Sequence, residues 1–239
     1  MSQATRPESA AGAASADLVL DGLGVVYGDL RALGDVVATA RPGEVTAVTG
    51  HSGAGKTSLL WAVGGLLGHQ QVEGTVLLDG QTIGDEESSR AAGAVLIPQG
   101  SALAEVLTAR DNVAVPLLAA GTAGTDATRR ADEALAAVGL GEHAGHLAEE
   151  LSGGQRQRVA VARGLALASL RLDEGGVLLL ADEPTSELDH DTRERVVSLV
   201  EDIARRGGIV LLATHDPEVA AVAAACWHLD DGRLTAGSR

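Results

Sequence analysis

The residues with the clearest chemical potential surround the only lysine of the chain, Lys56. The run from Gly50 to Gly55 precedes it and Thr57 follows, which satisfies the phosphate-loop pattern G-x-x-x-x-G-K-[ST]. Glycines let backbone N–H groups turn toward phosphates, a helix N-terminus adds positive potential, Lys56 adds a full charge, and the Thr57 hydroxyl can bind Mg²⁺. A chance glycine-rich turn is the alternative, and the rarity of lysine argues against it. The predicted nucleotide contacts are Gly50, His51, Ser52, Gly53, Ala54, Gly55, Lys56, Thr57 and Ser58.

Two acidic residues end a short apolar run much later in the chain. Val177 to Leu180 is typical of a buried strand, and Ala181, Asp182 and Glu183 follow it. Acidic residues at the carboxyl end of a parallel strand face the ligand crevice. Asp182 is therefore placed to hold Mg²⁺, and Glu183 to orient or deprotonate an attacking water. The alternative is a strand that ends in a polar turn, and the phosphate loop favours the functional interpretation.

A second anion cradle is predicted from the run Leu151 to Arg158, LSGGQRQR. Ser152 can cap a helix, and the amides of Gly153, Gly154 and Gln155 lie where that helix begins. An ordinary helix cap is the alternative. The run resembles the signature sequence of ABC ATPases and continues, as in that family, through Val159 to Gly164.

The resemblance covers Leu18 to Leu234, and it implies functional roles for further residues. Tyr27 is similar to the aromatic residue that stacks on adenine, and Gln99 to the glutamine that touches Mg²⁺ or water and senses a membrane partner. His215 resembles the switch histidine that contacts the γ-phosphate. Ser186 to Asp189 resembles the loop that reaches across a dimer. The resemblance implies the catalytic set Glu183, His215, Gln99 and Lys56 and the metal set Thr57, Gln99 and Asp182.

The family's mechanism implies an ATPase that works with Mg²⁺ as a head-to-tail pair. Each ATP is expected between the Lys56 loop of one subunit and the Ser152–Gly154 segment of a second ABC subunit, with a homodimer favoured. The implied partner is an integral membrane permease, which places the chain in the cytoplasm on the inner face of the membrane. Two alternatives stay open: a regulatory module that moves no cargo, and a soluble ABC protein acting on ribosomes or DNA.

The stretch Asp111 to Gly121 and the run Leu180 to Thr185 resemble the lipoprotein-release and macrolide-export branch of the family. The alternative is that both stretches are generic surroundings of a helix and a strand. Fold-level similarity does not fix a substrate, so cargo, permease and direction of transport stay open.

The elements that position these residues alternate between short buried strands and helices, which predicts a parallel α/β sheet. The resemblance implies a P-loop NTPase with a RecA-like core, an N-terminal antiparallel β subdomain and an inserted helical subdomain. We expect a disordered tail at 1–16, an ATPase domain at 17–239 and the helical subdomain at about 100–159. Strands are predicted at 18–26, 33–40, 45–49, 76–78, 94–97, 177–180 and 209–213. Helices are predicted at 57–67, 126–139, 156–167 and 192–206, with a surface loop at 169–176.

Composition limits the remaining classes. A formal charge of -15 argues against a general nucleic-acid binder, which needs a basic face. Aromatic residues are 1% of the chain, so aliphatic side chains must fill the core. Cys226 is the only cysteine, which rules out an intrachain disulfide. No apolar run approaches the roughly 20 residues of a membrane helix, and no signal peptide is evident, so any membrane role is expected to come through a partner.

Overall fold

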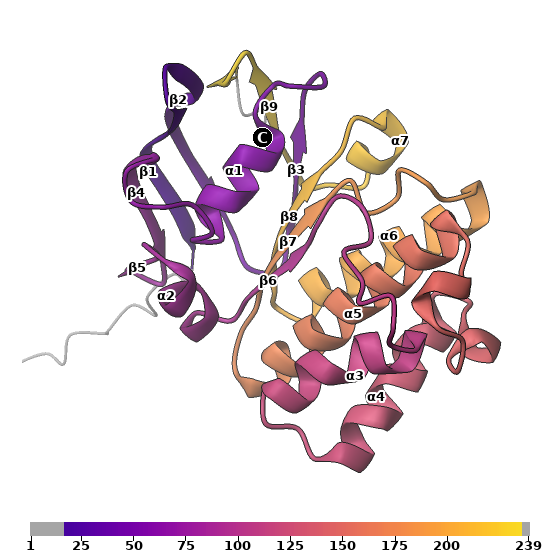
Figure 1. Ribbon diagram of the computed structural model, residues 1–239. Helices are drawn as coiled ribbons and strands as arrows, with labels where there is room; N and C mark the ends of the chain where they lie inside the picture. Colours follow the sequence, from indigo (N-terminus) through magenta and orange to yellow (C-terminus); the bar gives the residue numbers. More distant parts are fainter. Residues whose placement is uncertain (1–16, 236–239) are drawn as a thin grey trace, which may run out of the picture.

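The computed structural model describes residues 17–235, and the predicted tail at 1–16 lies outside this range, as do residues 236–239. Two β-sheets lie with one helix between them, and two long helices, α5 and α6, cover the far face of the larger sheet (Figure 1). No helix in this described part of the chain is long and apolar enough to cross a membrane.

The larger sheet has the strand order β10-β9-β3-β8-β7-β6, and it is parallel except for the pair β10–β9. In β7, Leu178 and Leu180 pack toward the smaller sheet, and Leu179 and Ala181 pack toward the helices. Burial on both faces explains the continuous apolar sequence of its central strands. The strands are β3 (Val45–Thr49), β6 (Ala94–Ile97), β7 (Leu178–Asp182), β8 (Ile209–Ala213), β9 (Ala225–Asp230) and β10 (Arg233–Leu234).

The smaller sheet is antiparallel, with the order β2-β1-β4-β5. Helix α1 (Lys56–Val63) packs between this sheet and strands β7 and β8 of the larger one. The loop that joins β3 to α1 therefore lies where the two sheets approach each other (Figure 1). The strands are β1 (Leu18–Tyr27), β2 (Leu30–Ala40), β4 (Val72–Leu78) and β5 (Gln81–Thr82).

The middle of the chain forms a helical cluster in which α3, α4 and α5 pack on one another. Helix α5 also packs on β6 and α6, which ties the cluster to the larger sheet. The predicted fold class is thereby confirmed. The helices are α2 (Glu86–Ala91), α3 (Ala109–Ala119), α4 (Gly124–Ala137), α5 (Gly153–Glu174), α6 (His190–Arg205) and α7 (Pro217–Ala220), with 3₁₀ turns η1 (Gly141–His143) and η2 (Ala148–Glu150).

Helix α5 corrects the prediction of a surface loop at 169–176. The helix continues to Glu174, and Leu170 is buried within this predicted loop. Leu, Arg and Glu are good helix formers, and only the pair Gly175–Gly176 ends the helix. Because α5 runs from the helical cluster onto the sheet, the division expected near residue 159 falls inside one helix.

Helix α1 is shorter than the predicted 57–67 and ends at Val63. Gly65 has φ +64°, and a Cβ there would lie 2.3 Å from the carbonyl oxygen of Asp85. The pair Gly64–Gly65 therefore turns the chain away from the helix axis.

Candidate functional site

The loop between β3 and α1 is held in place from both sides. A Cβ on Gly50 would lie 2.3 Å from the carbonyl oxygen of Leu229, and one on Gly55 would lie 2.8 Å from that of Ala32. Both glycines have positive φ, 145° and 103°, which other residues rarely adopt. The loop conformation therefore depends on glycine at these two positions, as the phosphate-loop pattern predicts.

Lys56 begins α1 with its side chain folded back over the loop, and only 8% of its surface is exposed. Its ammonium donates to the carbonyl oxygens of Gly50 at 2.9 Å and His51 at 3.2 Å. It also lies 3.8 Å from Oε1 of Glu183. The positive charge of Lys56 is thus held by two backbone carbonyl oxygens, next to the carboxylate of Glu183.

Thr57 and Asp182 meet at the bottom of the same loop. The Thr57 hydroxyl donates to Oδ2 of Asp182 at 2.7 Å, and Asp182 is 1% exposed. Oδ1 of Asp182 is buried without a hydrogen-bond partner. Burial raises the pKa of Asp182, and the charge of Glu183 acts in the same direction, while the Thr57 hydrogen bond and Lys56 oppose them. An orphaned carboxylate oxygen beside a hydroxyl fits the hard oxygen ligands that Mg²⁺ prefers.

Glu183 follows Asp182 and turns toward the other side of the site. Its φ is +48°, a rare conformation for a residue with a side chain, and its N–H donates to the carbonyl oxygen of Ala213 at 3.0 Å. Oε1 of Glu183 lies 2.9 Å from Nδ1 of His215, whose side chain is 67% exposed. A buried carboxylate is thus joined to an exposed imidazole that can approach a ligand.

These groups line one pocket of about 500 Å³, a volume in the usual range for small-molecule sites. It brings together many of the residues that the sequence nominated from distant parts of the chain. The predicted residues in its lining are Tyr27, Ser52, Gly53, Gly55, Lys56, Thr57, Ser58, Gln99, Asp182, Glu183 and His215. Leu30 and Ala32 also line it and were not predicted, because they belong to no motif and reach the site through the position of β2.

The remaining predicted residues lie outside this lining. Gly50, His51 and Ala54 complete the loop, and the His51 side chain faces the turn between β9 and β10. Ser152 caps α5 by accepting from the Gln155 N–H at 3.3 Å, while its own N–H donates to Oε1 of Gln155 at 2.8 Å. The Ser152–Gln155 segment, with Gly153 and Gly154, thus forms the predicted helix start away from the pocket.

The segment just after β7 packs beside this helix start. A Cβ on Gly153 would lie 3.4 Å from Oε2 of Glu187, and one on Gly154 would lie 3.3 Å from the Glu187 carbonyl oxygen. Glu187 lies in the Ser186–Asp189 loop, whose last residue caps α6 through the N–H of Thr192. The loop that follows the acidic strand therefore connects the pocket side of the molecule with the start of α5.

The chain is similar to a large group of known proteins. Residues 33–186 match the ABC transporter family. The ABC transporter ATP-binding protein YtrE of Bacillus subtilis is 34% identical over 87% of this chain and 89% of its own length. The methionine import ATP-binding protein MetN of Corynebacterium diphtheriae is 39% identical, over 80% of this chain and 55% of its own length.

The macrolide export ATP-binding/permease protein MacB of Marinobacter nauticus is 38% identical over 81% of this chain. The match spans only 29% of that relative's length. A solved dimer of the ATP-binding cassette MJ0796, in a post-hydrolysis state bound to ADP and Pi, has a TM-score of 0.81 at 30% identity. That comparison covers 93% of this chain and 98% of the solved one.

Proposed function

The chain belongs to the ABC transporter family, and we propose that it binds and hydrolyses ATP with Mg²⁺ to drive a membrane permease. The observation that carries the proposal is the single pocket in which Lys56, Asp182, Glu183 and His215 meet. Their chemistry suits a polyphosphate ligand, because a fixed cation, backbone N–H groups and carboxylates that can hold a cation converge on one cavity.

Each side chain has a role that follows from its position. Lys56 and the loop amides bind the phosphates, and Tyr27 and Leu30 offer an apolar surface to the base. Glu183 orients or accepts a proton from the attacking water, and His215, at 2.9 Å from it, keeps this carboxylate in place. Thr57, Asp182 and Gln99 would hold Mg²⁺, which neutralises charge on the phosphates when bound.

We further propose that two chains complete each nucleotide site. The Ser152–Gly154 helix start offers backbone N–H groups to an anion, but it does not line the pocket that contains Lys56. A second copy placed head to tail would bring this segment to the phosphates held at Lys56. The dimeric ADP-bound and Pi-bound relative supports this arrangement.

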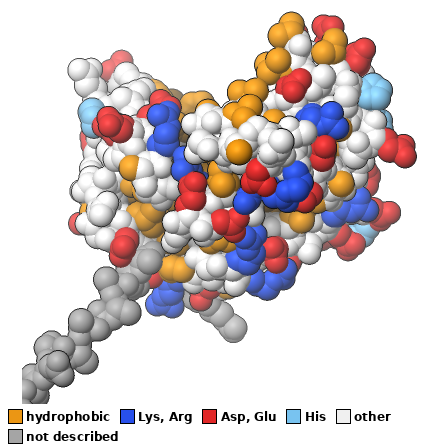
Figure 2. Space-filling model, turned by 90° about the horizontal axis from the view of Figure 1, so that it is seen from below, with side chains coloured by type: hydrophobic (Ala, Val, Ile, Leu, Met, Phe, Trp, Pro, Cys, Tyr) orange, Lys and Arg blue, Asp and Glu red, His pale blue; other side chains and the backbone are white. Residues whose placement is uncertain are grey.

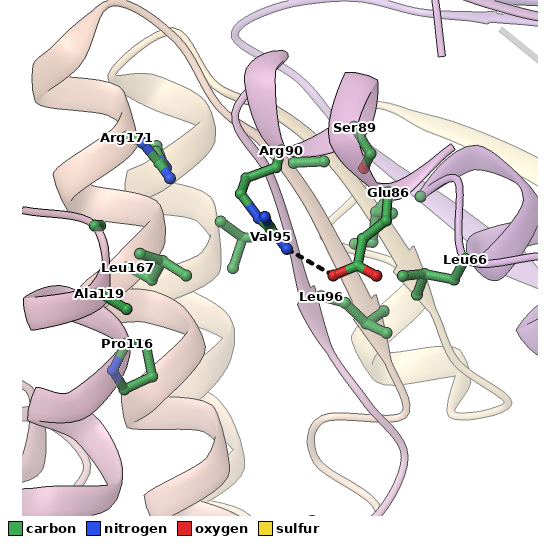
Figure 3. A pocket seen from close by; sticks show the side chains of 14 residues that line it. Leu66, Glu86, Ser89, Arg90, Val95, Leu96, Pro116, Ala119, Leu167 and Arg171 are labelled. Carbon is green, nitrogen blue, oxygen red and sulfur yellow. Dashed lines mark hydrogen bonds and ion pairs between the residues drawn. The ribbon is translucent and has the colours of Figure 1, made fainter. Parts of the chain in front are cut away.

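A groove on the other side of the helical cluster suits the permease. It holds about 490 Å³ between the end of α1, strand β6 and helices α3 and α5 (Figure 3). Its walls include the apolar side chains Leu66, Val95, Leu96, Pro116, Ala119 and Leu167, and also the charged side chains of Glu86, Arg90 and Arg171. A short amphipathic helix of the permease suits a groove with both apolar and charged walls, and its binding would place the chain on the inner face of the membrane.

Large apolar side chains are partly exposed on the elements that form this groove. Leu66, Val115 and Leu118 are each nearly half exposed. On the face seen in Figure 2, acidic and basic side chains are interspersed, and hydrophobic side chains border the hollow at its upper edge. The chain spans about 30% of the length of the macrolide-export relatives, so the identity of the permease and its cargo are not assigned.

Substitution of Lys56 tests the proposal. Lys56→Ala removes the one full charge at the loop, so ATP affinity should fall by about tenfold or more, as expected for charged hydrogen bonds of about 1.5–3 kcal/mol. Isothermal titration with ATP and Mg²⁺ measures this loss, and phosphate release measures turnover. Arg205→Ala removes an exposed cation far along α6 and serves as the matched control. Equal ATP affinity and turnover in Lys56→Ala and wild type would refute the assignment.

A further inference from the structure

His51 lies in the phosphate loop, yet its imidazole turns away from the nucleotide pocket. Nε2 of His51 lies 3.3 Å from Oδ1 of Asp231 and 3.6 Å from Oδ1 of Asp230. Among residues 17–235, this is the only place where three His, Cys, Asp or Glu side chains bring ligand atoms within 4.8 Å of one another. Nothing in the proposed ATPase mechanism uses this cluster.

The protonation of His51 is fixed by a contact outside the cluster. Nδ1 lies 2.8 Å from the carbonyl oxygen of Ser52, and a carbonyl oxygen can only accept, so Nδ1 carries a proton. In the neutral ring, Nε2 then has a free lone pair that points at two carboxylates. A lone pair and two carboxylates repel one another, and a cation placed between them turns this repulsion into attraction.

The two distances from Nε2 are compatible with a metal ion. A hydrogen bond between an imidazolium and a carboxylate is about 2.7–2.9 Å long, which is shorter than both contacts of His51. A tetrahedral ion with bonds of about 2.0–2.1 Å holds neighbouring ligand atoms about 3.3–3.4 Å apart, close to the observed 3.3 and 3.6 Å. An imidazole whose other N–H donates to a backbone carbonyl is also the usual arrangement of a metal-binding histidine.

The two acidic ligands stand on a rigid turn. Asp231 and Gly232 both have positive φ, 43° and 75°, as in the tight two-residue turns that join antiparallel strands. The Gly232 N–H donates to the carbonyl oxygen of Ala54 at 3.1 Å, and its own carbonyl accepts from the N–H of Gly34 at 2.9 Å. The backbone of the turn is therefore tied to the phosphate loop and to β2, which places the two acidic residues beside His51.

We propose that His51, Asp230 and Asp231 bind one divalent transition-metal ion of the Zn²⁺ class. Imidazole nitrogen with carboxylate oxygen suits Zn²⁺, Co²⁺ or Ni²⁺ better than Mg²⁺, which prefers oxygen alone. The side chains are 53%, 62% and 91% exposed, so water completes the coordination. The ion bridges the outer side of the phosphate loop and the β9–β10 turn, separate from the Thr57–Asp182 site. It thereby fastens the loop whose inner side faces the nucleotide pocket.

Titration of the full-length, untagged chain with ZnCl₂ tests this site. Excess Mg²⁺ and the absence of nucleotide keep Zn²⁺ from the oxygen ligands of the nucleotide site. Wild type should bind one equivalent of Zn²⁺ and gain thermal stability from it, because only the folded chain holds the three ligands together. His51→Ala should weaken this binding by about tenfold or more and lose the thermal shift, as expected when a ligand is removed.

Two further variants make the result specific. Asp231→Asn removes a charged ligand but keeps a residue that tolerates positive φ, so it should fold normally and still bind Zn²⁺ more weakly. His190→Ala is the matched control, since His190 lies 3.5 Å from Glu194 in an exposed pair with two ligand atoms. Its affinity should equal that of wild type. The proposal is overturned if wild type shows no saturable binding of one equivalent, or if His51→Ala and Asp231→Asn bind as tightly as wild type.

Discussion

The contribution of the hydrogen bond between Thr57 and Asp182 to stability can be tested by substitution. Thr57→Val keeps the shape of the side chain but removes the hydroxyl that donates to Asp182 at 2.7 Å. Oδ1 of Asp182 has no partner, so this change leaves a buried carboxylate without any hydrogen bond. A hydrogen bond to a charged group is worth about 1.5–3 kcal/mol, and we expect a loss of about 2 kcal/mol in the free energy of unfolding.

Thermal unfolding without nucleotide measures this loss. For a chain of this size, about 2 kcal/mol corresponds to a fall of about 4–8 °C in Tm at neutral pH. Thr57→Ser keeps the hydroxyl and is the matched control, with a much smaller change expected. A Tm fall in Thr57→Ser as large as that in Thr57→Val would contradict the role of the hydrogen bond, because serine keeps the hydroxyl.

The pH dependence of the stability loss in Thr57→Val distinguishes an effect of the Asp182 charge from an effect of packing. Burial raises the pKa of Asp182, so on acidification the folded chain takes up this proton before the unfolded chain does. The contribution of Asp182 to the free energy of unfolding therefore increases as the pH falls from the raised pKa of the folded chain toward the ordinary pKa of the unfolded chain. Thr57→Val raises the pKa further, so its deficit relative to wild type should be largest at neutral pH and shrink in acid. A deficit that is independent of pH would refute the reasoning.

Two other substitutions probe neighbouring parts of the chain. Asn112 is buried, and its side chain forms hydrogen bonds with the backbone of Ala104, Leu107 and Thr108. Asn112→Ala should therefore lower the free energy of unfolding, measured by urea denaturation, by about 2–4 kcal/mol. A loss below about 0.5 kcal/mol would contradict this expectation. Ser152→Arg should leave ATP affinity of the single chain unchanged in titration but stop ATP-dependent pairing, and full ATPase activity in this variant would contradict the role of Ser152 across the dimer.

Much of the site could be predicted from sequence because its motifs are local. The run from Gly50 to Thr57 fixes loop shape, charge and hydroxyl within a few residues, and the structure places all of them around one loop. Asp182 was predictable because a continuous apolar run identifies a buried parallel strand and hence its carboxyl end. Such patterns depend on short-range chemistry, which a sequence displays directly.

Other features depend on contacts that a single sequence does not display. Leu30 reaches the pocket only because β2 pairs with β1 in a given register. The last turns of α5 carry several charged residues around the buried Leu170. These charged residues led to the prediction of a surface loop in place of a helix. Strand β9 was missed, although Trp227 and Leu229 alternate with polar residues before the Asp231–Gly232 turn, a hairpin signal that was present.

The central claim is that each chain holds half of a nucleotide site that a second copy completes. Light scattering of Glu183→Gln, with and without ATP and Mg²⁺, tests it most directly. Glutamine keeps the shape of Glu183 but cannot accept a proton, so bound ATP should persist and hold two chains together. We predict a monomer without nucleotide and a dimer with ATP. A variant that binds ATP yet stays monomeric at saturating ATP would contradict the account.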